Sequence, residues 1–207
     1  MSSKRAETRL DPERERKRVS GRDQLLVLGL GNLLCQDDGV GVAAVAWLLD
    51  RYEPAEGVRV LDGGTLGLSL LPTLENADTV LIVDAIRADG PPGSPVRLEG
   101  EEVAHAAEHR LSVHQVGVSD LIGAARWQGC LPGRLLLLGV VPESMELGVE
   151  RTPAVEAALP ALVDRVLREC SALGFPFSPR QLDEKSRTAG LVGNDVHRLF
   201  GLPCEVR

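Results

Sequence analysis

The feature that most constrains the fold is a short continuous apolar segment, QLLVLG at residues 24–29, which ends in glycine. A strand that is apolar on both sides is typical of a parallel sheet covered by helices on both faces, because half-exposed strands alternate apolar and polar residues instead. The segment that follows, residues 39–52, places apolar side chains at helical spacing. Residues 24–52 therefore predict a strand followed by a helix, the first half of a βαβ unit.

The rest of the chain repeats this alternation. We predict strands at residues 58–61, 77–83 and 134–141, an edge strand at 96–99, and helices at 65–74, 115–127 and 152–173. Such alternation predicts an α/β protein, a three-layer sandwich whose twisted, mainly parallel sheet of about five strands carries helices on both faces. Ligands of open α/β sheets bind beyond the carboxyl ends of the strands, so the functional residues are expected there.

The two ends of the chain differ in composition from the middle. Residues 1–22 hold eight Lys or Arg against four Asp or Glu and have little apolar periodicity. They predict a disordered charged arm, although a basic arm could also contact an acidic surface. We expect the α/β domain at residues 23–174 and a mostly irregular tail at 175–207, with one short helix near 183–188.

Charge and cysteine usage exclude several classes of protein. The net charge of −7 argues against a protein that binds nucleic acid. The apolar segments have the length of strands, so no membrane span or secretory signal is expected. The four cysteines form no CxxC pair, which suits a reducing compartment, so we expect a cytoplasmic protein without a disulfide framework; they are Cys35, Cys130, Cys170 and Cys204.

Three carboxylates and one histidine fall at strand ends or at a helix start. Asp38 follows the first strand, Asp62 ends the second, Asp84 ends the third, and His114 opens a later helix. The carboxyl ends of neighbouring parallel strands lie about 4.8 Å apart. Groups distant in sequence are therefore expected to meet in one crevice.

Dinucleotide binding is one interpretation of this arrangement. Gly29-x-Gly31 after a strand is half of the glycine fingerprint, and Asp62 stands where an acid that binds a ribose belongs. However, Leu34 replaces the third glycine, and the pair Asp37-Asp38 would repel a pyrophosphate at the helix start. We therefore do not favour this interpretation.

A metal site is the other interpretation. Two carboxylates at one mouth repel each other unless a cation lies between them, and desolvating each costs several kcal/mol. Two oxygens from Asp38 and Asp84 and one nitrogen from His114 suit a borderline divalent ion with open coordination positions. A strand-end Asp is often a cap or turn residue and a lone His is often structural, so the pattern alone leaves open both a metal site and a purely structural role for these residues.

Neighbouring residues have simpler interpretations. For Asp37 we favour a helix cap over a second acceptor at the site. Cys35 is predicted to be a small core residue, because no base that would activate it as a nucleophile is evident. His105, His109 and His197 are expected to be solvated or without a role.

Five segments together resemble one family. They are LVLGLGNLLCQDDGVGV, LDGGTLGLSLL, LIVDAI, SVHQVG and LLLLGVVPES, in this order over about residues 24–174. They resemble the hydrogenase maturation endopeptidases, nickel-dependent proteases that trim the carboxyl terminus of the large subunit of nickel–iron hydrogenases. The resemblance implies a twisted, mainly parallel sheet with helices on both faces.

The resemblance also implies the roles of individual residues. By position in the motifs, Asp38, Asp84 and His114 would be the catalytic residues and the ligands of nickel, which the precursor supplies. The first of these positions takes either Asp or Glu in the family. The substrate-binding residues implied are Asp62, Gly63, Thr65 and Gln115.

The activity implied is that of a cytoplasmic aspartic-type endopeptidase. It would remove the carboxyl-terminal extension of the large-subunit precursor after nickel insertion and so act as a maturation checkpoint. We expect a monomer whose partner is that precursor. The alternative is a nickel-sensing binding protein of hydrogenase assembly that cleaves nothing.

Overall fold

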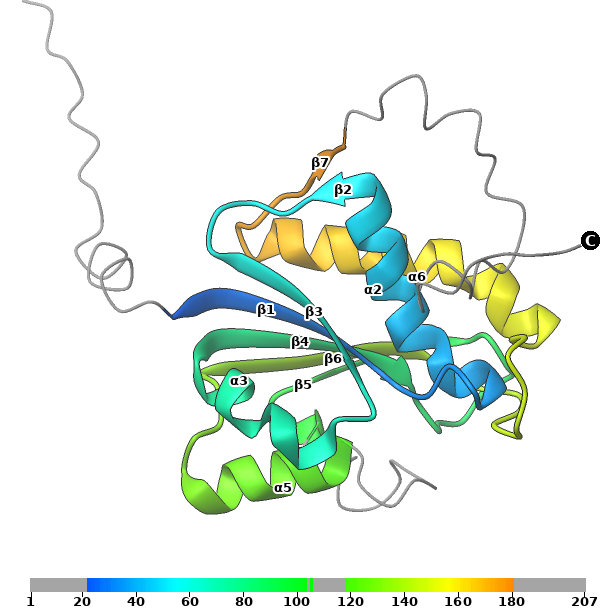
Figure 1. Ribbon diagram of the computed structural model, residues 1–207, viewed down its shortest axis with the longest axis horizontal. Helices are drawn as coiled ribbons and strands as arrows, with labels where there is room; N and C mark the ends of the chain where they lie inside the picture. The colour runs from blue at the N-terminus through cyan, green and yellow to red at the C-terminus, as the bar shows by residue number, and fades with distance from the viewer. Residues whose placement is uncertain (1–21, 104, 106–117, 181–207) are drawn as a thin grey trace, which may run out of the picture.

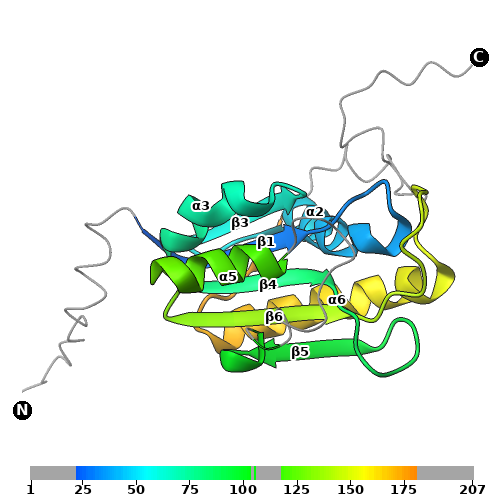
Figure 2. The ribbon, with the colours of Figure 1, turned by 90° about the horizontal axis from the view of Figure 1, so that it is seen from below.

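The computed structural model describes residues 22–103, 105 and 118–180, so the predicted arm and the predicted short helix near 183–188 lie outside it. Its main sheet has five strands in the order β3-β1-β4-β6-β5 (Figures 1 and 2). Four of them are parallel: β1 (Asp23–Leu30), β3 (Val58–Gly64), β4 (Ala77–Ala85) and β6 (Arg134–Val140). The edge strand β5 (Pro95–Glu99) runs antiparallel to β6. The prediction of a mainly parallel sheet is confirmed.

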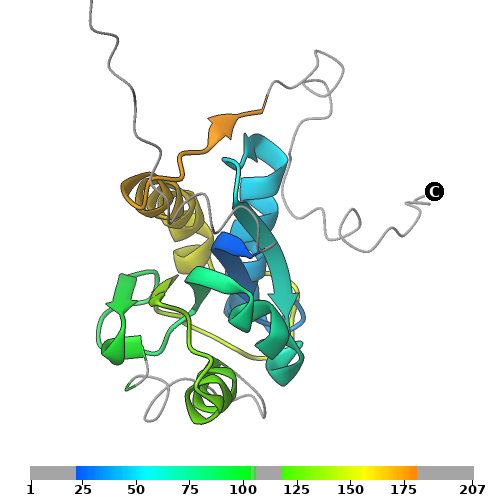
Figure 3. The same ribbon diagram turned by 90° about the vertical axis from the view of Figure 1, so that its left-hand side faces the viewer.

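Helices cover both faces of this sheet (Figure 3). One face carries α2 (Val40–Arg51) and α6 (Pro153–Ala172), and the other carries α3 (Leu71–Glu75) and α5 (Val118–Gln128). The helix predicted at 65–74 is instead a 3₁₀ turn, η2 (Gly67–Leu70), that leads into the single turn of α3. Because helices cover both faces of the sheet, the three-layer architecture is the predicted one.

The central strand β1 shows why its sequence is continuously apolar. Leu25 and Val27 are fully buried against α2 and α6, while Leu26 and Leu28 are fully buried on the opposite face. Alternate side chains of a strand point to opposite faces, so a strand covered on both sides needs apolar residues at every position.

Two glycines let α2 approach the sheet closely. A side chain at Gly41 would collide with the carbonyl oxygens of Leu30 and Val83, and a Cβ at Gly29 would lie 2.5 Å from the Gly41 oxygen. Only glycine leaves room for backbone at these points. The start of α2 therefore rests directly on the carboxyl ends of β1 and β4, where the predicted site residues lie.

The fold continues beyond α6, which runs through Pro160 as one helix. Phe175 and Phe177 pack against the core formed with α2 and α6. A short antiparallel ribbon then joins β7 (Ser178–Pro179) to β2 (Tyr52–Glu53). This ribbon was not predicted, and it adds residues after 174 to the packed structure.

No helix in the described part of the chain is both long and apolar enough to cross a bilayer.

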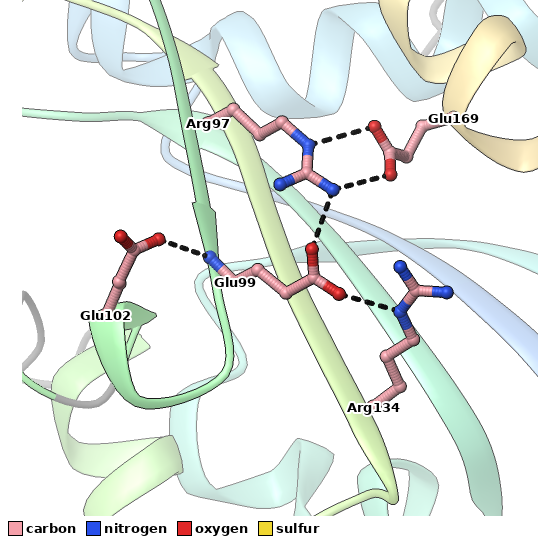
Figure 4. A network of polar contacts seen from close by, with 5 residues as sticks. All are labelled: Arg97, Glu99, Glu102, Arg134 and Glu169. Atoms are coloured by element: carbon pink, nitrogen blue, oxygen red, sulfur yellow. Dashed lines mark hydrogen bonds and ion pairs between the residues drawn. The ribbon is translucent and has the colours of Figure 1, made fainter. Parts of the chain in front are cut away.

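A network of ion pairs joins the edge strand to α6 (Figure 4). Arg97 on β5 donates two hydrogen bonds to Glu169 on α6, at 3.0 and 2.8 Å, and a third to Glu99 at 2.8 Å. Glu99 also accepts a hydrogen bond from Arg134 on β6 at 2.8 Å. The bond from Arg97 lowers the pKa of Glu169, and the bonds from Arg134 and Arg97 lower the pKa of Glu99.

We expect a double-mutant cycle of Arg97→Ala and Glu169→Ala to give a coupling energy of about 1 kcal/mol, because the pair is bidentate but partly exposed. Since folding lowers the pKa of Glu169 from 4.5, the coupling is present in full above pH 4.5 and is lost as the pH falls through the lowered pKa. Chemical unfolding at two pH values measures it. Arg168→Ala replaces an exposed arginine on α6, next to Glu169, and is the control for Arg97→Ala. A coupling near zero at pH 7 would contradict this prediction.

Candidate active site

The loop after β1 folds back so that Asp38 lies beside the strand ends. Gly31 adopts φ 121°, a left-handed conformation, and a side chain there would collide with the Asp38 carbonyl oxygen. The next backbone N–H, that of Asn32, donates a hydrogen bond to Asp38 Oδ2 at 2.8 Å. The Asp38 side chain belongs to the short 3₁₀ helix η1 (Gln36–Gly39) and is 7 % exposed. The glycine turn thus fixes both the position and the orientation of this carboxylate.

The Asn32 side chain stabilises the same turn, a role that the sequence analysis missed. Its Oδ1 accepts a hydrogen bond from the Leu34 N–H at 3.0 Å, and its Nδ2 donates to Cys35 Sγ at 3.3 Å. An asparagine that bonds the backbone two residues ahead is a known turn-forming pattern, so Asn after Gly31 was the available signal. Cys35 is buried, in agreement with the expected core position.

Asp84 ends β4 at the same edge of the sheet and is half-buried. Its Oδ1 accepts a hydrogen bond from the Ala85 N–H at 2.8 Å. Burial raises the pKa of Asp84 to about 8, the negative charge of Asp38 adds to this rise, and the Ala85 hydrogen bond opposes it. The two carboxylates therefore share one electrostatic environment, and a cation between them would remove the repulsion.

Asp37 has a different position from its neighbour. Its carboxylate is fully buried and accepts hydrogen bonds from Glu143 N at 2.8 Å, Ser144 N at 3.0 Å, Thr152 N at 2.7 Å and Thr152 Oγ1 at 2.9 Å. No side-chain cap is made at η1 or α2, so the favoured interpretation of Asp37 as a helix cap is wrong. Asp37 instead ties the loop after β1 to the loop after β6, because four donors converge on one buried anion.

The predicted substrate-binding residues of the Asp-Gly-Gly-Thr motif lie at the end of β3, next to β1. The register shifts there, since Gly29 pairs with Asp62 while Leu30 pairs with Gly64, which leaves Gly63 as a bulge. Asp62 is exposed, and its Oδ1 accepts a hydrogen bond from the Gly64 N–H at 2.9 Å. The exposed Thr65 follows. The motif therefore presents polar groups one strand away from the Asp38 loop.

His114 and Gln115, the remaining predicted site residues, lie outside the described residues. Within the described residues, no three His, Cys, Asp or Glu side chains form a group that could hold a metal ion. Asp38 and Asp84, two of the three predicted ligands, lie close enough for the charge of Asp38 to raise the pKa of Asp84. His105 is exposed, as expected.

The fold and site together define a class of protein. It is an α/β protein with paired carboxylates at the carboxyl edge of a parallel sheet, the edge where such folds bind ligands. The paired charges would repel a phosphate approaching the start of α2, which argues against dinucleotide binding. Carboxylates that share a site are suited to metal binding or to general acid–base catalysis.

The chain belongs to the hydrogenase maturation protease family, whose model matches residues 42–169. Over 159 residues it is 39 % identical to the hydrogenase 2 maturation protease of Escherichia coli, covering 76 % of this chain and 97 % of that protein. This membership confirms the sequence prediction of a hydrogenase maturation endopeptidase.

Solved structures agree with this assignment. The hydrogenase-maturating endopeptidase HybD from E. coli is similar with a TM-score of 0.70 at 39 % identity, over 76 % of this chain and 98 % of that chain. The [NiFe] hydrogenase maturation protease HybD from Thermococcus kodakarensis is similar with a TM-score of 0.57 at 26 % identity, over 70 % and 97 % of the two chains.

We expect Asp37→Asn to lower the free energy of unfolding by about 2–4 kcal/mol, because the amide would turn a donor toward N–H groups that need an acceptor. Urea unfolding followed by circular dichroism measures the change. Asp50→Asn, an exposed carboxylate on α2, is the matched control and should change stability by less than about 0.5 kcal/mol. Equal stability of Asp37→Asn and the wild type would show that the four hydrogen bonds contribute little.

Proposed function

We propose that the protein is a nickel-dependent, aspartic-type endopeptidase that removes the carboxyl-terminal extension of the hydrogenase large-subunit precursor after nickel insertion. The observation that carries the proposal is the proximity of Asp38 and Asp84 at the ligand-binding edge of the sheet, in a chain of this family. We also propose that the enzyme acts as a monomer in the cytoplasm. Buried Cys35 and Cys170, both free thiols, are compatible with a reducing compartment.

The precursor brings the nickel, which is therefore part of the substrate. Asp38, Asp84 and His114 bind this ion and place the scissile peptide at the edge of the sheet. Three protein ligands leave coordination positions open for groups of the precursor. Fixing the ion fixes the reacting bond, since proximity and orientation lower the barrier of hydrolysis.

Each protein group has a defined task in this proposal. Asp38 is held by the Asn32 N–H at Oδ2, which orients its carboxylate toward the edge of the sheet. Asp62, Gly63, Thr65 and Gln115 contact the precursor chain. The attack on the peptide uses one of three routes, a carbonyl polarised by the ion, a water activated by the ion, or a water deprotonated by a carboxylate.

We expect His114→Ala to abolish precursor processing while the protein keeps a cooperative thermal transition. The proposed role of His114 is to supply the nitrogen donor to the ion, so its loss should lower the free energy of unfolding by less than about 1 kcal/mol. The measurement is cleavage of nickel-loaded precursor, followed by gel shift. His105→Ala, at an exposed histidine outside the proposed site, is the control and should process normally.

Processing by His114→Ala at the wild-type rate would exclude the proposed role. Loss of its thermal transition would show instead that His114 is needed for folding. A wild-type enzyme that binds the loaded precursor without cutting it would favour a nickel-sensing protein.

We expect cleavage to follow metal loading of the precursor rather than of the enzyme. Closed structural sites use four protein ligands, whereas this site offers three, so the isolated enzyme should hold nickel loosely and purify mostly empty. The measurement compares metal-free with nickel-loaded precursor, using one enzyme batch. If metal-free precursor is cut equally fast with chelator present, the enzyme is a metal-independent protease that uses Asp38 or Asp84.

A further inference from the structure

An exposed apolar surface lies beside the site, on the two loops that Asp37 joins. Leu34 is 53 % exposed, Leu147 is 88 % exposed and Val149 is 48 % exposed. We call these three residues the apolar rim. Scattered apolar residues are normal on a protein surface, but a cluster next to a functional site marks an interaction surface.

Backbone pairing brings the three residues together. Cys35 and Gly148 form a parallel β-bridge, with Gly148 N donating to the Leu34 oxygen at 2.9 Å and Gln36 N donating to the Gly148 oxygen at 2.8 Å. Leu34 and Leu147 each precede a bridged residue and so lie side by side. Since Cys35 is buried, alternation directs its neighbour Leu34 outward, and Leu147 and Val149 alternate with Gly148 in the same way.

The loops that carry the apolar rim are held in place by hydrogen bonds to the Asp37 carboxylate. The Asp37 carboxylate accepts hydrogen bonds from Glu143 N and Ser144 N on one side of the rim residues and from Thr152 N on the other. The residue after Asp37 is Asp38, so the rim and the candidate catalytic carboxylate are fixed by the same contacts. Figure 2 shows the loop after β1 (blue) next to the loop after β6 (yellow-green) at one end of the sheet.

The rim is bordered by negative charge. Glu143, Glu146 and Glu150 are exposed on the same loop, and no cation of the described residues is shown paired with them. The nearby Arg151 forms an ion pair with Glu156 at 2.7 Å and does not neutralise the border. An apolar centre with an acidic border is complementary to a segment that carries apolar and basic side chains.

We propose that the apolar rim and its acidic border bind a segment of the hydrogenase large-subunit precursor that carries apolar and basic side chains next to the bond to be cut. This inference rests on the proposed function, which supplies the precursor as substrate. The occupant is the precursor because the rim adjoins Asp38 on loops fixed by a shared anion. Binding there seats the chain before the nickel reaches the carboxylates.

The test measures binding of metal-free precursor to the enzyme, which the proposed checkpoint leaves uncut. We expect the double variant Leu147→Ser/Val149→Ser to bind at least 5-fold more weakly than the wild type. Trp127→Ser is the matched control, because Trp127 is 87 % exposed at the end of α5 that leads to the start of β6, at the opposite edge of the sheet, and it should bind within twofold of the wild type. Thermal unfolding of each variant checks that the fold is retained.

A second variant tests the charged border without altering the apolar surface. We expect Glu146→Gln/Glu150→Gln to bind at least 3-fold more weakly at low salt, with the difference reduced in 0.5 M salt because screening weakens exposed charges. Unchanged binding by both double variants would overturn the proposal. A wild-type dimer that the Leu147→Ser/Val149→Ser change converts to a monomer would overturn it in favour of a second copy of the chain.

Failure of this inference and failure of the proposed function can be told apart. Cleavage of nickel-loaded precursor by the wild type is read separately, so its failure counts against the protease proposal alone. If metal-free precursor is cut, the KM of that reaction replaces the binding constant, and the same fold-changes are expected.

Discussion

The buried carboxylate of Asp37 is the interaction on which the carboxyl edge of the molecule depends. It accepts four hydrogen bonds from residues more than a hundred positions later in the chain. One of its donors, Thr152, is also the N-cap residue of α6. A single anion thus joins the loop after β1, the loop after β6 and the start of the longest helix among the described residues. A carboxylate without these donors would cost too much free energy to bury, so the loops and the anion stabilise each other.

Asp37 and Asp38 are neighbours in sequence, but their carboxylates have different surroundings. The Asp37 oxygens are saturated by donors, which suits a structural role and leaves no capacity for a ligand. Asp38 accepts a hydrogen bond from the Asn32 N–H at Oδ2, and its negative charge adds to the burial that raises the pKa of Asp84. Carboxylates that repel each other destabilise the fold, so their persistence at one edge indicates a role outside stability. The structural anion fixes the backbone so that Asp38 is kept close enough to Asp84 for its charge to raise the pKa of that carboxyl.

The sequence predicted the sheet because strands buried on both faces leave a continuous apolar pattern. The same logic located Asp38 after β1 and Asp84 near the end of β4, and it located Asp62 near the end of the partly exposed edge strand β3. It could not find the partners of Asp37, because a hydrogen bond between residues 37 and 152 leaves no periodicity in either segment. The β2–β7 ribbon was missed for a related reason, as two-residue strands are too short to show alternation. The segment expected to form one helix at 65–74 is divided into a 3₁₀ helix and a short α-helix, where glycine and proline shorten the α-helical run.

The proposed site combines weak binding of the metal ion with a strongly fixed backbone, and the two are physically linked. Two carboxylates and one imidazole cannot close the coordination of a divalent ion, so under this proposal affinity for the ion alone would be low and the precursor would supply the remaining ligands. Selectivity for a nickel-loaded precursor then requires that the peptide bind the enzyme at a place separate from the metal ligands. The proposed role of the apolar rim is to bind the peptide in this way, since the rim is held by the same Asp37 contacts yet carries no metal donors. Peptide binding and ion binding become two contributions that add only when both are present, because seating the peptide raises the effective concentration of its ion at the carboxylates. An empty precursor would gain the first contribution without the second, which is the physical basis for discrimination at this edge of the sheet.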